Sequence, residues 1–246
     1  MTATRMKRAE PPQVDRERAA LVFQRLRDVY GPHEWHSHGP PLDELIGTVL
    51  SQNTSDVNTA RSFRSLRDRF PDWELVRLAP AEDVADAIRS GGLAQIKAPR
   101  IKGILDDIAE RNGELSLDHL RDVDVPAATA ELTALHGVGP KTAACVLLFS
   151  LGRPAMPVDT HVHRVSNRIG LVPPRTSAER TQPILESLLG KDRDVVLTAH
   201  INLIHHGRQI CRAQRPRCGR CPVAPMCDYY RTGIGVPPDD GEDDDV

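Results

Sequence analysis

The sequence that decides the fold runs Leu135-His136-Gly137-Val138-Gly139-Pro140-Lys141-Thr142-Ala143. Its two glycines allow backbone angles that residues with a side chain avoid, and Pro140 suits the first position of a helix. The small and apolar residues that follow continue as a buried helix. The stretch therefore predicts a helix, a tight glycine turn and a second helix.

This turn directs backbone N–H groups outward at a helix N-terminus, where they bind a phosphate oxygen without contacting a base. The pattern therefore favours DNA binding that is independent of sequence. Lys141 falls in the first turn of the second helix, where the helix dipole disfavours a second cation and favours the neutral amine of a nucleophile. A solvated lysine that only adds charge to a DNA-binding hairpin explains the motif equally well, so both interpretations stay open.

Length and composition limit the class of protein. The 246 residues suffice for one large domain or two modest ones, and only 4% are aromatic, so Leu, Val, Ile and Ala must supply the core. No apolar run approaches the roughly 20 residues that span a membrane. The N-terminus is polar and lacks an apolar signal core. We therefore expect a soluble cytoplasmic protein, nucleoid-associated if it is bacterial, with no membrane partner.

The net charge of −2 combines an acidic C-terminal segment with a mildly basic remainder. Six acidic residues stand among the last eight positions, and removing their six negative charges changes the net charge from −2 to +4. The remainder is mildly basic, which is compatible with nucleic acid as a partner. Residues 1–13 form a basic arm and residues 232–246 an acidic tail, and we expect both to be disordered.

Helical periodicity recurs along the whole chain, and no alternating strand pattern persists, so the sequence predicts an all-α fold. A break rich in glycine and proline at 152–157 indicates a crossover between domains. Asp159 follows it, at the position of a helix N-cap. Capping alone explains an aspartate there, and a catalytic carboxylate is a compatible second role.

Three loops beside predicted helix ends contain candidate binding residues. Ser51-Gln52-Asn53-Thr54 follows an apolar helix, and its side chains are either end caps or groups that face a ligand. Leu93 follows a glycine pair, where it is either a core residue or a wedge that enters a base stack. A loop with His33, His36 and His38 is better interpreted as a plain polar loop than as a metal site.

Four of the five cysteines gather within 17 residues, with the spacing Cys211-x6-Cys218-x2-Cys221-x5-Cys227. Four thiolates satisfy either a tetrahedral zinc ion or a 4Fe-4S cluster. Structural zinc usually has two Cys-x2-Cys pairs and here there is one, which favours iron–sulfur over zinc. Five arginines surround these cysteines, so this region is expected to form a basic patch. Cys145 lies in an apolar helix and is interpreted as a small core residue.

Taken together, these motifs resemble the endonuclease III family of helix-hairpin-helix DNA glycosylases over residues 14–231. The resemblance rests on the hairpin at 135–143, the sequence Val158-Asp159-Thr160-His161 and the cysteine spacing, all in the family's order. It implies two helical domains that flank a DNA-binding cleft. One is a six-helix barrel domain, residues 41–152, and the other is an iron–sulfur domain, residues 14–40 and 153–231, with a 4Fe-4S cluster as cofactor.

The same resemblance assigns roles to individual residues. Lys141 matches the catalytic lysine and Asp159 the catalytic aspartate. The hairpin residues Gly137, Val138 and Gly139 match those that bind the DNA backbone, and Leu93 resembles a wedge. Either Gln52 or Asn53 would fill the gap left by an extruded base. His136 and Pro140 depart from the common proline and arginine of the hairpin, and the loss of that arginine predicts a weaker phosphate contact nearby.

The implied function is a monomeric bifunctional DNA glycosylase/AP lyase that acts on duplex DNA containing damaged bases or abasic sites. It would remove oxidised pyrimidines by Schiff-base chemistry and cut the strand by β-elimination. An adenine-specific mismatch glycosylase is one alternative, although it typically has serine where Lys141 stands. Another monofunctional glycosylase and a non-enzymatic DNA-binding module are the others, and a module would need neither Lys141 nor Asp159.

Overall fold

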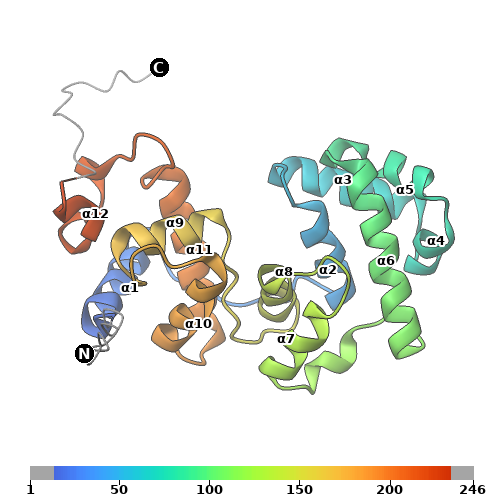
Figure 1. The fold of residues 1–246 in the computed structure, drawn as a ribbon, viewed down its shortest axis with the longest axis horizontal. Helices are drawn as coiled ribbons and strands as arrows, with labels where there is room; N and C mark the ends of the chain where they lie inside the picture. Colours follow the sequence, from blue (N-terminus) through green and yellow to red (C-terminus); the bar gives the residue numbers. More distant parts are fainter. Residues whose placement is uncertain (1–13, 234–246) are drawn as a thin grey trace, which may run out of the picture. The chain divides into compact units, whose positions relative to one another are not determined.

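The computed structural model describes residues 14–233. Within this range it consists of helices, turns and loops, without a strand (Figure 1), so the predicted all-α fold is confirmed. None of the helices in this range is long and apolar enough to cross a membrane. The predicted basic arm, 1–13, and the acidic residues of the predicted tail, within 234–246, lie outside the described residues.

The α-helices follow in the order α1 (Arg16–Tyr30), α2 (Pro41–Leu50), α3 (Asp56–Arg69), α4 (Trp73–Leu78), α5 (Ala81–Ala87), α6 (Ala94–Asn112), α7 (Val125–Thr133), α8 (Pro140–Cys145), α9 (Thr160–Ile169), α10 (Ala178–Leu189), α11 (Arg193–Gln209) and α12 (Asp228–Arg231). Short helical turns are η1 (Arg89–Gly91), η2 (Asp118–Arg121), η3 (Val146–Ser150), η4 (Cys218–Arg220) and η5 (Ala224–Met226). The helices divide into two compact units, described separately below. The first, the hairpin unit, comprises residues 34–157 and 191–193, and the second, the cysteine unit, comprises residues 14–33, 158–190 and 194–233.

Aliphatic side chains fill the core of the hairpin unit. Helix α6 packs against α4 and α5, whereas α2 packs against α3, α8 and the π-helical turn η3. Leu45, Ile101 and Leu147 are fully buried in this core. The arrangement places α8 directly beside α2 in the interior, so one face of the hairpin's second helix is fixed by the core.

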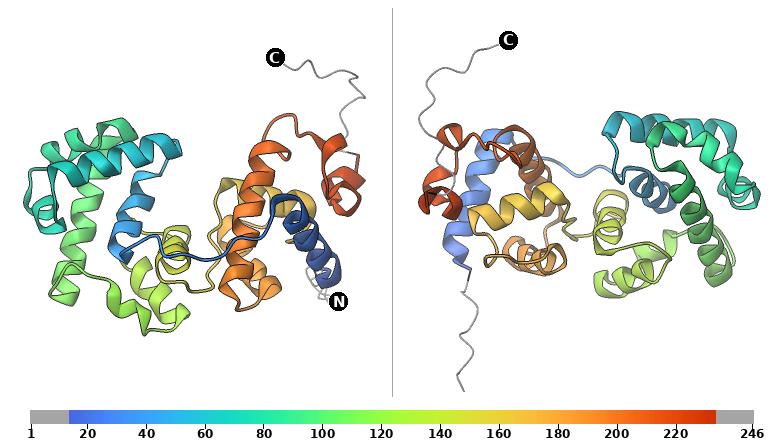
Figure 2. Two further views of the ribbon diagram at one scale, coloured as in Figure 1. Left: turned by 180° about the vertical axis from the view of Figure 1, so that it is seen from behind. Right: turned by 45° about the horizontal axis from the view of Figure 1, so that its top comes forward.

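The cysteine unit joins the N-terminal helix to the C-terminal segment. Helix α1 lies beside α11 (Figure 2), and the hydroxyl of Tyr30 contacts Nδ1 of His206 at 3.1 Å. The Arg18 guanidinium donates to the carbonyl oxygens of Ile169 and Met226, at 3.1 and 2.8 Å, and pairs with Asp228 at 2.8 Å. These contacts anchor the segment after α11, which carries the four clustered cysteines, to the first helix of the chain.

Candidate active site and DNA-binding loops

The predicted glycine turn connects α7 to α8. Gly137 has φ +75°, in the left-handed region that favours glycine. Gly139 is the N-cap of α8, which has no side-chain cap, so the N–H groups of its first turn are left for another partner. Val138 lies buried between these two exposed glycines. The turn is therefore held by one apolar anchor while its glycine backbone faces outward.

Lys141 stands in the first turn of α8 and lines an open pocket of the hairpin unit with a volume of about 790 Å³. The pocket walls come from the loop before α2, from α2 itself, from the start of α3 and from α8 with η3. The wall carries three carboxylates, three hydroxyls and a thiol, which belong to Asp43, Glu44, Asp56, Thr48, Ser51, Thr59 and Cys145. Lys141 therefore shares an open cavity with three carboxylates, three hydroxyls and a thiol.

Cys145 lies one helical turn after Lys141 and is 4% exposed. Lys141 and Thr48 line the same pocket, and both act on its thiol. Burial raises the pKa of Cys145 to about 11, against the opposing effect of the Lys141 charge, and the Glu44 charge raises it further. The group is therefore a neutral thiol at physiological pH. It packs behind the lysine as a small core residue, as the sequence predicted, and also borders the pocket.

Glu44, in the first turn of α2, is held on two sides. Its Oε1 accepts a hydrogen bond from Thr48 at 3.3 Å, and its Oε2 lies 3.3 Å from Nδ1 of His38. The hydrogen bond to Glu44 is the largest cause that raises the pKa of His38, and burial opposes it. The His38 ring also stacks on Phe149, with ring centroids 4.9 Å apart and planes inclined by 2°. The pocket wall thus contains a fixed carboxylate next to a flat pair of rings.

Asp159 belongs to the cysteine unit, where it is the N-cap of α9. Its Oδ1 accepts a hydrogen bond from the backbone N–H of Val162 at 2.7 Å, so the predicted capping role is confirmed. One carboxylate oxygen is engaged by the helix, and the other remains available for a second partner. Lys141 and Asp159 are thus placed by different units of the fold.

The polar loop after α2 presents its two amide side chains differently. Gln52 accepts a hydrogen bond at 2.8 Å from Nη1 of Arg100, on α6. Asn53 is exposed at the loop tip and has φ +56°, a conformation that asparagine tolerates better than most residues. Ser55 caps α3 through Asn58. Capping therefore accounts for only part of this polar cluster.

Leu93 is 49% exposed and has φ +51°, so it is not a core residue. It directly precedes α6, and the exposed Ile96 stands in the first turn of that helix. Beneath them Lys97, only 2% exposed, donates to the carbonyl oxygens of Leu50 and Gly91 at 2.7 and 2.9 Å. One buried ammonium group therefore joins the end of α2, where the polar loop begins, to the turn that carries Leu93.

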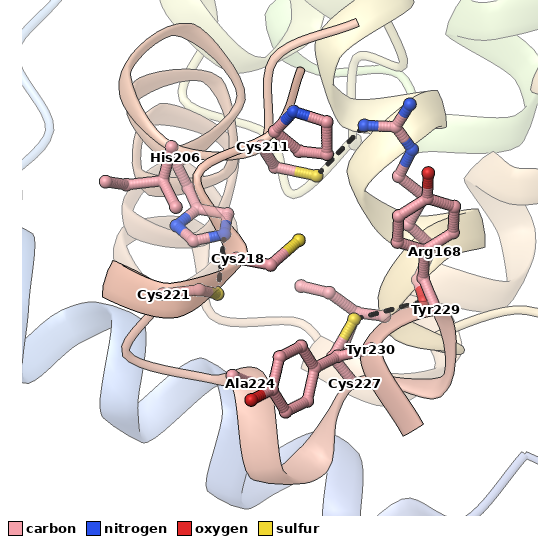
Figure 3. Close-up of a pocket in the computed structure, with 12 residues that line it drawn as sticks. Arg168, His206, Cys211, Cys218, Cys221, Ala224, Cys227, Tyr229 and Tyr230 are labelled. Carbon is pink, nitrogen blue, oxygen red and sulfur yellow. Dashed lines mark hydrogen bonds between the residues drawn. The ribbon is translucent and has the colours of Figure 1, made fainter. Parts of the chain in front are cut away.

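Four sulfur atoms of the cysteine unit surround one hollow (Figure 3), and they belong to Cys211, Cys218, Cys221 and Cys227. Arg168 contacts the sulfur of Cys211 at 3.7 Å, and Nε2 of His206 lies 3.6 Å from that of Cys221. Among the described residues, no group of three His, Cys, Asp or Glu side chains is placed to hold a single metal ion. The four cysteines therefore line one hollow, as the sequence predicts, but they are not arranged to ligate a single metal ion.

Burial in this hollow disfavours the thiolate forms of its cysteines. Burial raises the pKa of Cys221 to about 12, and the neighbouring cysteines add to the shift. Burial likewise raises the pKa values of Cys218 and Cys227. Metal ligation requires thiolates, and a bound metal cation would supply the positive charge that stabilises them. The donor set and its apolar surroundings thus suit a cationic metal group.

Comparisons with known proteins agree with this arrangement. Residues 46–191 match the model of the HhH-GPD superfamily of base excision DNA repair proteins. Endonuclease III of Thermotoga maritima is 38% identical over 198 residues, which cover 80% of this chain and 86% of that protein. A protein of Arabidopsis thaliana named as a DNA glycosylase is 43% identical over 140 residues, or 57% of this chain and 48% of that one. A solved structure of a trapped covalent intermediate of endonuclease III with DNA superposes with a TM-score of 0.75 at 26% identity, covering 90% of this chain and 100% of that one.

The chain belongs to the HhH-GPD superfamily. The resemblance to endonuclease III is confirmed in sequence and in fold. Within the superfamily, the chain is a base-excision-repair DNA glycosylase with AP lyase activity, and its partner is duplex DNA.

Sequence analysis missed several residues of this HhH-GPD site. Glu44 and Thr48 are one helical turn apart on α2, and Lys141 and Cys145 are one turn apart on α8, so each pair lies on one helix face. This spacing of polar residues on two largely apolar helices is a sequence feature from which the pocket residues could have been predicted. No sequence feature marks His38, because its contacts with Glu44 and Phe149 depend on the tertiary fold.

Proposed function

We propose that the chain excises oxidised pyrimidines from duplex DNA and cuts the strand at the resulting abasic site. The observation that carries this proposal is the position of Lys141, which lines a pocket of about 790 Å³ beside the glycine turn. A base inside a duplex is out of reach, so the damaged nucleotide must be extruded before it enters the pocket. The pocket volume is ample for a single pyrimidine.

Lys141 is the nucleophile in this proposal. Its neutral amine attacks C1′ of the deoxyribose, so the Nζ–C1′ bond forms while the bond from C1′ to the base breaks, and the base leaves with a proton. Opening of the sugar ring gives a Schiff base between Lys141 and C1′. Loss of a proton from C2′ then expels the 3′-phosphate by β-elimination, which cuts the strand. Water finally releases the lysine.

Asp159 stabilises the positive charge that develops on the sugar and assists its deprotonation. Support comes from its position as the N-cap of α9, where the hydrogen bond from Val162 fixes the carboxylate. A cap of this kind has one oxygen to spare for the substrate.

The DNA backbone is bound at the hairpin by Gly137, Val138 and Gly139. The uncapped N-terminus of α8 supports this role, because its N–H groups suit a phosphate oxygen. Leu93 serves as a wedge at the lesion, and its exposure in a left-handed conformation supports that role. Asn53, rather than Gln52, fills the gap left by the extruded base, since Gln52 is engaged by Arg100.

These four cysteines would hold a 4Fe-4S cluster, a group that four cysteine thiolates bind. It would supply structural support there, and the arginine-rich loop between Cys211 and Cys221 would add to phosphate binding. We propose two domains, a cluster domain of residues 14–40 and 153–231 and a barrel domain of residues 41–152.

The test uses two labelled duplexes, one with thymine glycol as the oxidised pyrimidine and one with adenine opposite an oxidised guanine. Release of free thymine glycol together with strand cutting supports the proposal. Release of adenine, or release of either base without strand cutting, contradicts it. Asp159→Asn should bind the first duplex and release its base at least about 100-fold more slowly.

A further inference from the structure

Glu44 in the Lys141 pocket has no part in the mechanism above. Its side chain is only 17% exposed. A carboxylate in a pocket that receives part of a polyanion weakens binding unless it has a partner there. Helix-dipole stabilisation explains an acidic residue in the first turn of α2, but it does not require one that faces this pocket.

The carboxylate is held in one orientation. Thr48 donates to Oε1 and His38 lies against Oε2, both at 3.3 Å. His38 is fixed in turn, because its backbone N–H donates to the carbonyl oxygen of Phe149 at 3.0 Å and its ring stacks on that side chain. An ionised carboxylate has about four lone-pair positions, and only two are used here. The remaining two are available to a hydrogen-bond donor in the pocket.

The chemistry of this wall matches one edge of a pyrimidine. Pyrimidines carry N–H donors at N3 or at the exocyclic N4, and an ionised carboxylate only accepts hydrogen bonds. The parallel rings of His38 and Phe149 add a flat surface of the type on which a base stacks. We infer that Glu44 is a specificity-determining residue that accepts a hydrogen bond from N3–H or N4–H of the extruded base. This inference rests on the proposed function, because it places the base in the pocket of Lys141.

The substrate class follows from the acceptor. Pyrimidines and their oxidised forms that keep an N–H on this edge are bound, whereas bases with only acceptors or a methylated nitrogen there are rejected. A buried acceptor left without its donor is costly, so discrimination of this kind exceeds what shape alone gives.

Glu44 has a second route to the chemistry, through the neighbouring thiol. Its charge acts on Cys145, and the charge of Lys141 acts on the same thiol. A residue that acts by this route affects Lys141 whether or not a base is present. An abasic site has no base, so comparing base release with cutting at an abasic site separates the two routes.

The experiment measures single-turnover base release from a thymine glycol duplex and strand cutting of the matched abasic duplex, for the full chain. Glu44→Gln keeps the shape and replaces one acceptor oxygen with a donor. We expect its base release to fall about 10- to 100-fold and its abasic cutting to stay within about twofold of the wild type. Glu44→Asp keeps the negative charge, but its shorter side chain moves the carboxylate away from the base. Its rate of base release should lie between those of the wild type and Glu44→Gln.

Glu17→Gln is the control, because it removes a first-turn carboxylate from α1, in the other unit. It should leave both rates unchanged. Equal losses of both rates in Glu44→Gln, or no loss in either, would overturn the inference. If the wild type cuts neither duplex, the proposed function itself is refuted, and that result is distinct from any behaviour of the variant.

Discussion

Replacing Gly137 with alanine tests the hairpin most sharply. At φ +75° a Cβ atom would lie 2.9 Å from both Cδ and Nε of Arg100. The left-handed conformation costs a residue with a side chain about 1–2 kcal/mol. Arg100 must move aside, and its hydrogen bond to Gln52 contributes about 0.5–1.5 kcal/mol. Gly137→Ala should therefore lower the free energy of unfolding by about 2–3 kcal/mol, which is about 4–12 °C in Tm for a chain of this size.

Gly139→Ala is a matched control two residues away. Gly139 has φ −96°, and a Cβ there meets nothing within 4 Å. Its stability should stay within about 0.5 kcal/mol of the wild type. Because the bare backbone at this position is proposed to bind phosphate, its affinity for duplex DNA should nevertheless fall.

Calorimetry supplies the Tm values, and fluorescence anisotropy with a labelled abasic-analogue duplex supplies the affinities. Equal Tm values for the two variants would refute the assignment of Gly137 as the strained turn position. Full DNA affinity in Gly139→Ala would refute the proposed backbone contact.

Three further predictions concern single side chains. Leu93→Gly removes a leucine from a left-handed conformation, so the free energy of unfolding should stay unchanged or rise by up to about 1 kcal/mol. The rate of base release should fall at least about tenfold, because the wedge is lost. A fall in both stability and base release would contradict the wedge assignment. Since pairing with Glu44 raises the pKa of His38 in the folded chain, the pair stabilises the fold below about pH 6.5, and this contribution is lost as the pH rises through the folded pKa. An NMR titration should show the His38 pKa falling toward its ordinary value in Glu44→Gln, and an unchanged value would disprove the pairing. Cys145, with a pKa of about 11, should resist iodoacetamide at neutral pH in the native protein and react after unfolding, as followed by peptide mass spectrometry; labelling of the native form would show that the thiol is neither buried nor neutral.

Local signals were enough to predict the hairpin, the cap at Asp159 and the grouping of the cysteines. Each depends on a few neighbouring residues, such as the glycine pair that permits φ +75° at Gly137. The all-α fold follows from helical periodicity over the whole chain. These features are recoverable because the physics that produces them is local in sequence.

The contacts that position the DNA loops could not be predicted in this way. No local sequence feature indicates burial of Lys97, yet it is 2% exposed and donates to the carbonyl oxygens of Leu50 and Gly91. Arg100 contacts Gln52, 48 residues earlier in the chain. The loop of His38 was interpreted as plain and polar, and its role appears only once Phe149 lies beside it. Such pairs arise from tertiary packing, which periodicity does not encode.

Borohydride trapping on a duplex with a single abasic site tests the central claim, that Lys141 is the Schiff-base nucleophile. Reduction should convert the wild-type intermediate into a stable covalent complex with DNA, and Lys141→Ala should yield none while still binding the duplex. Trapping by Lys141→Ala at the wild-type level, or no trapping by a wild type that binds the duplex, would contradict the account.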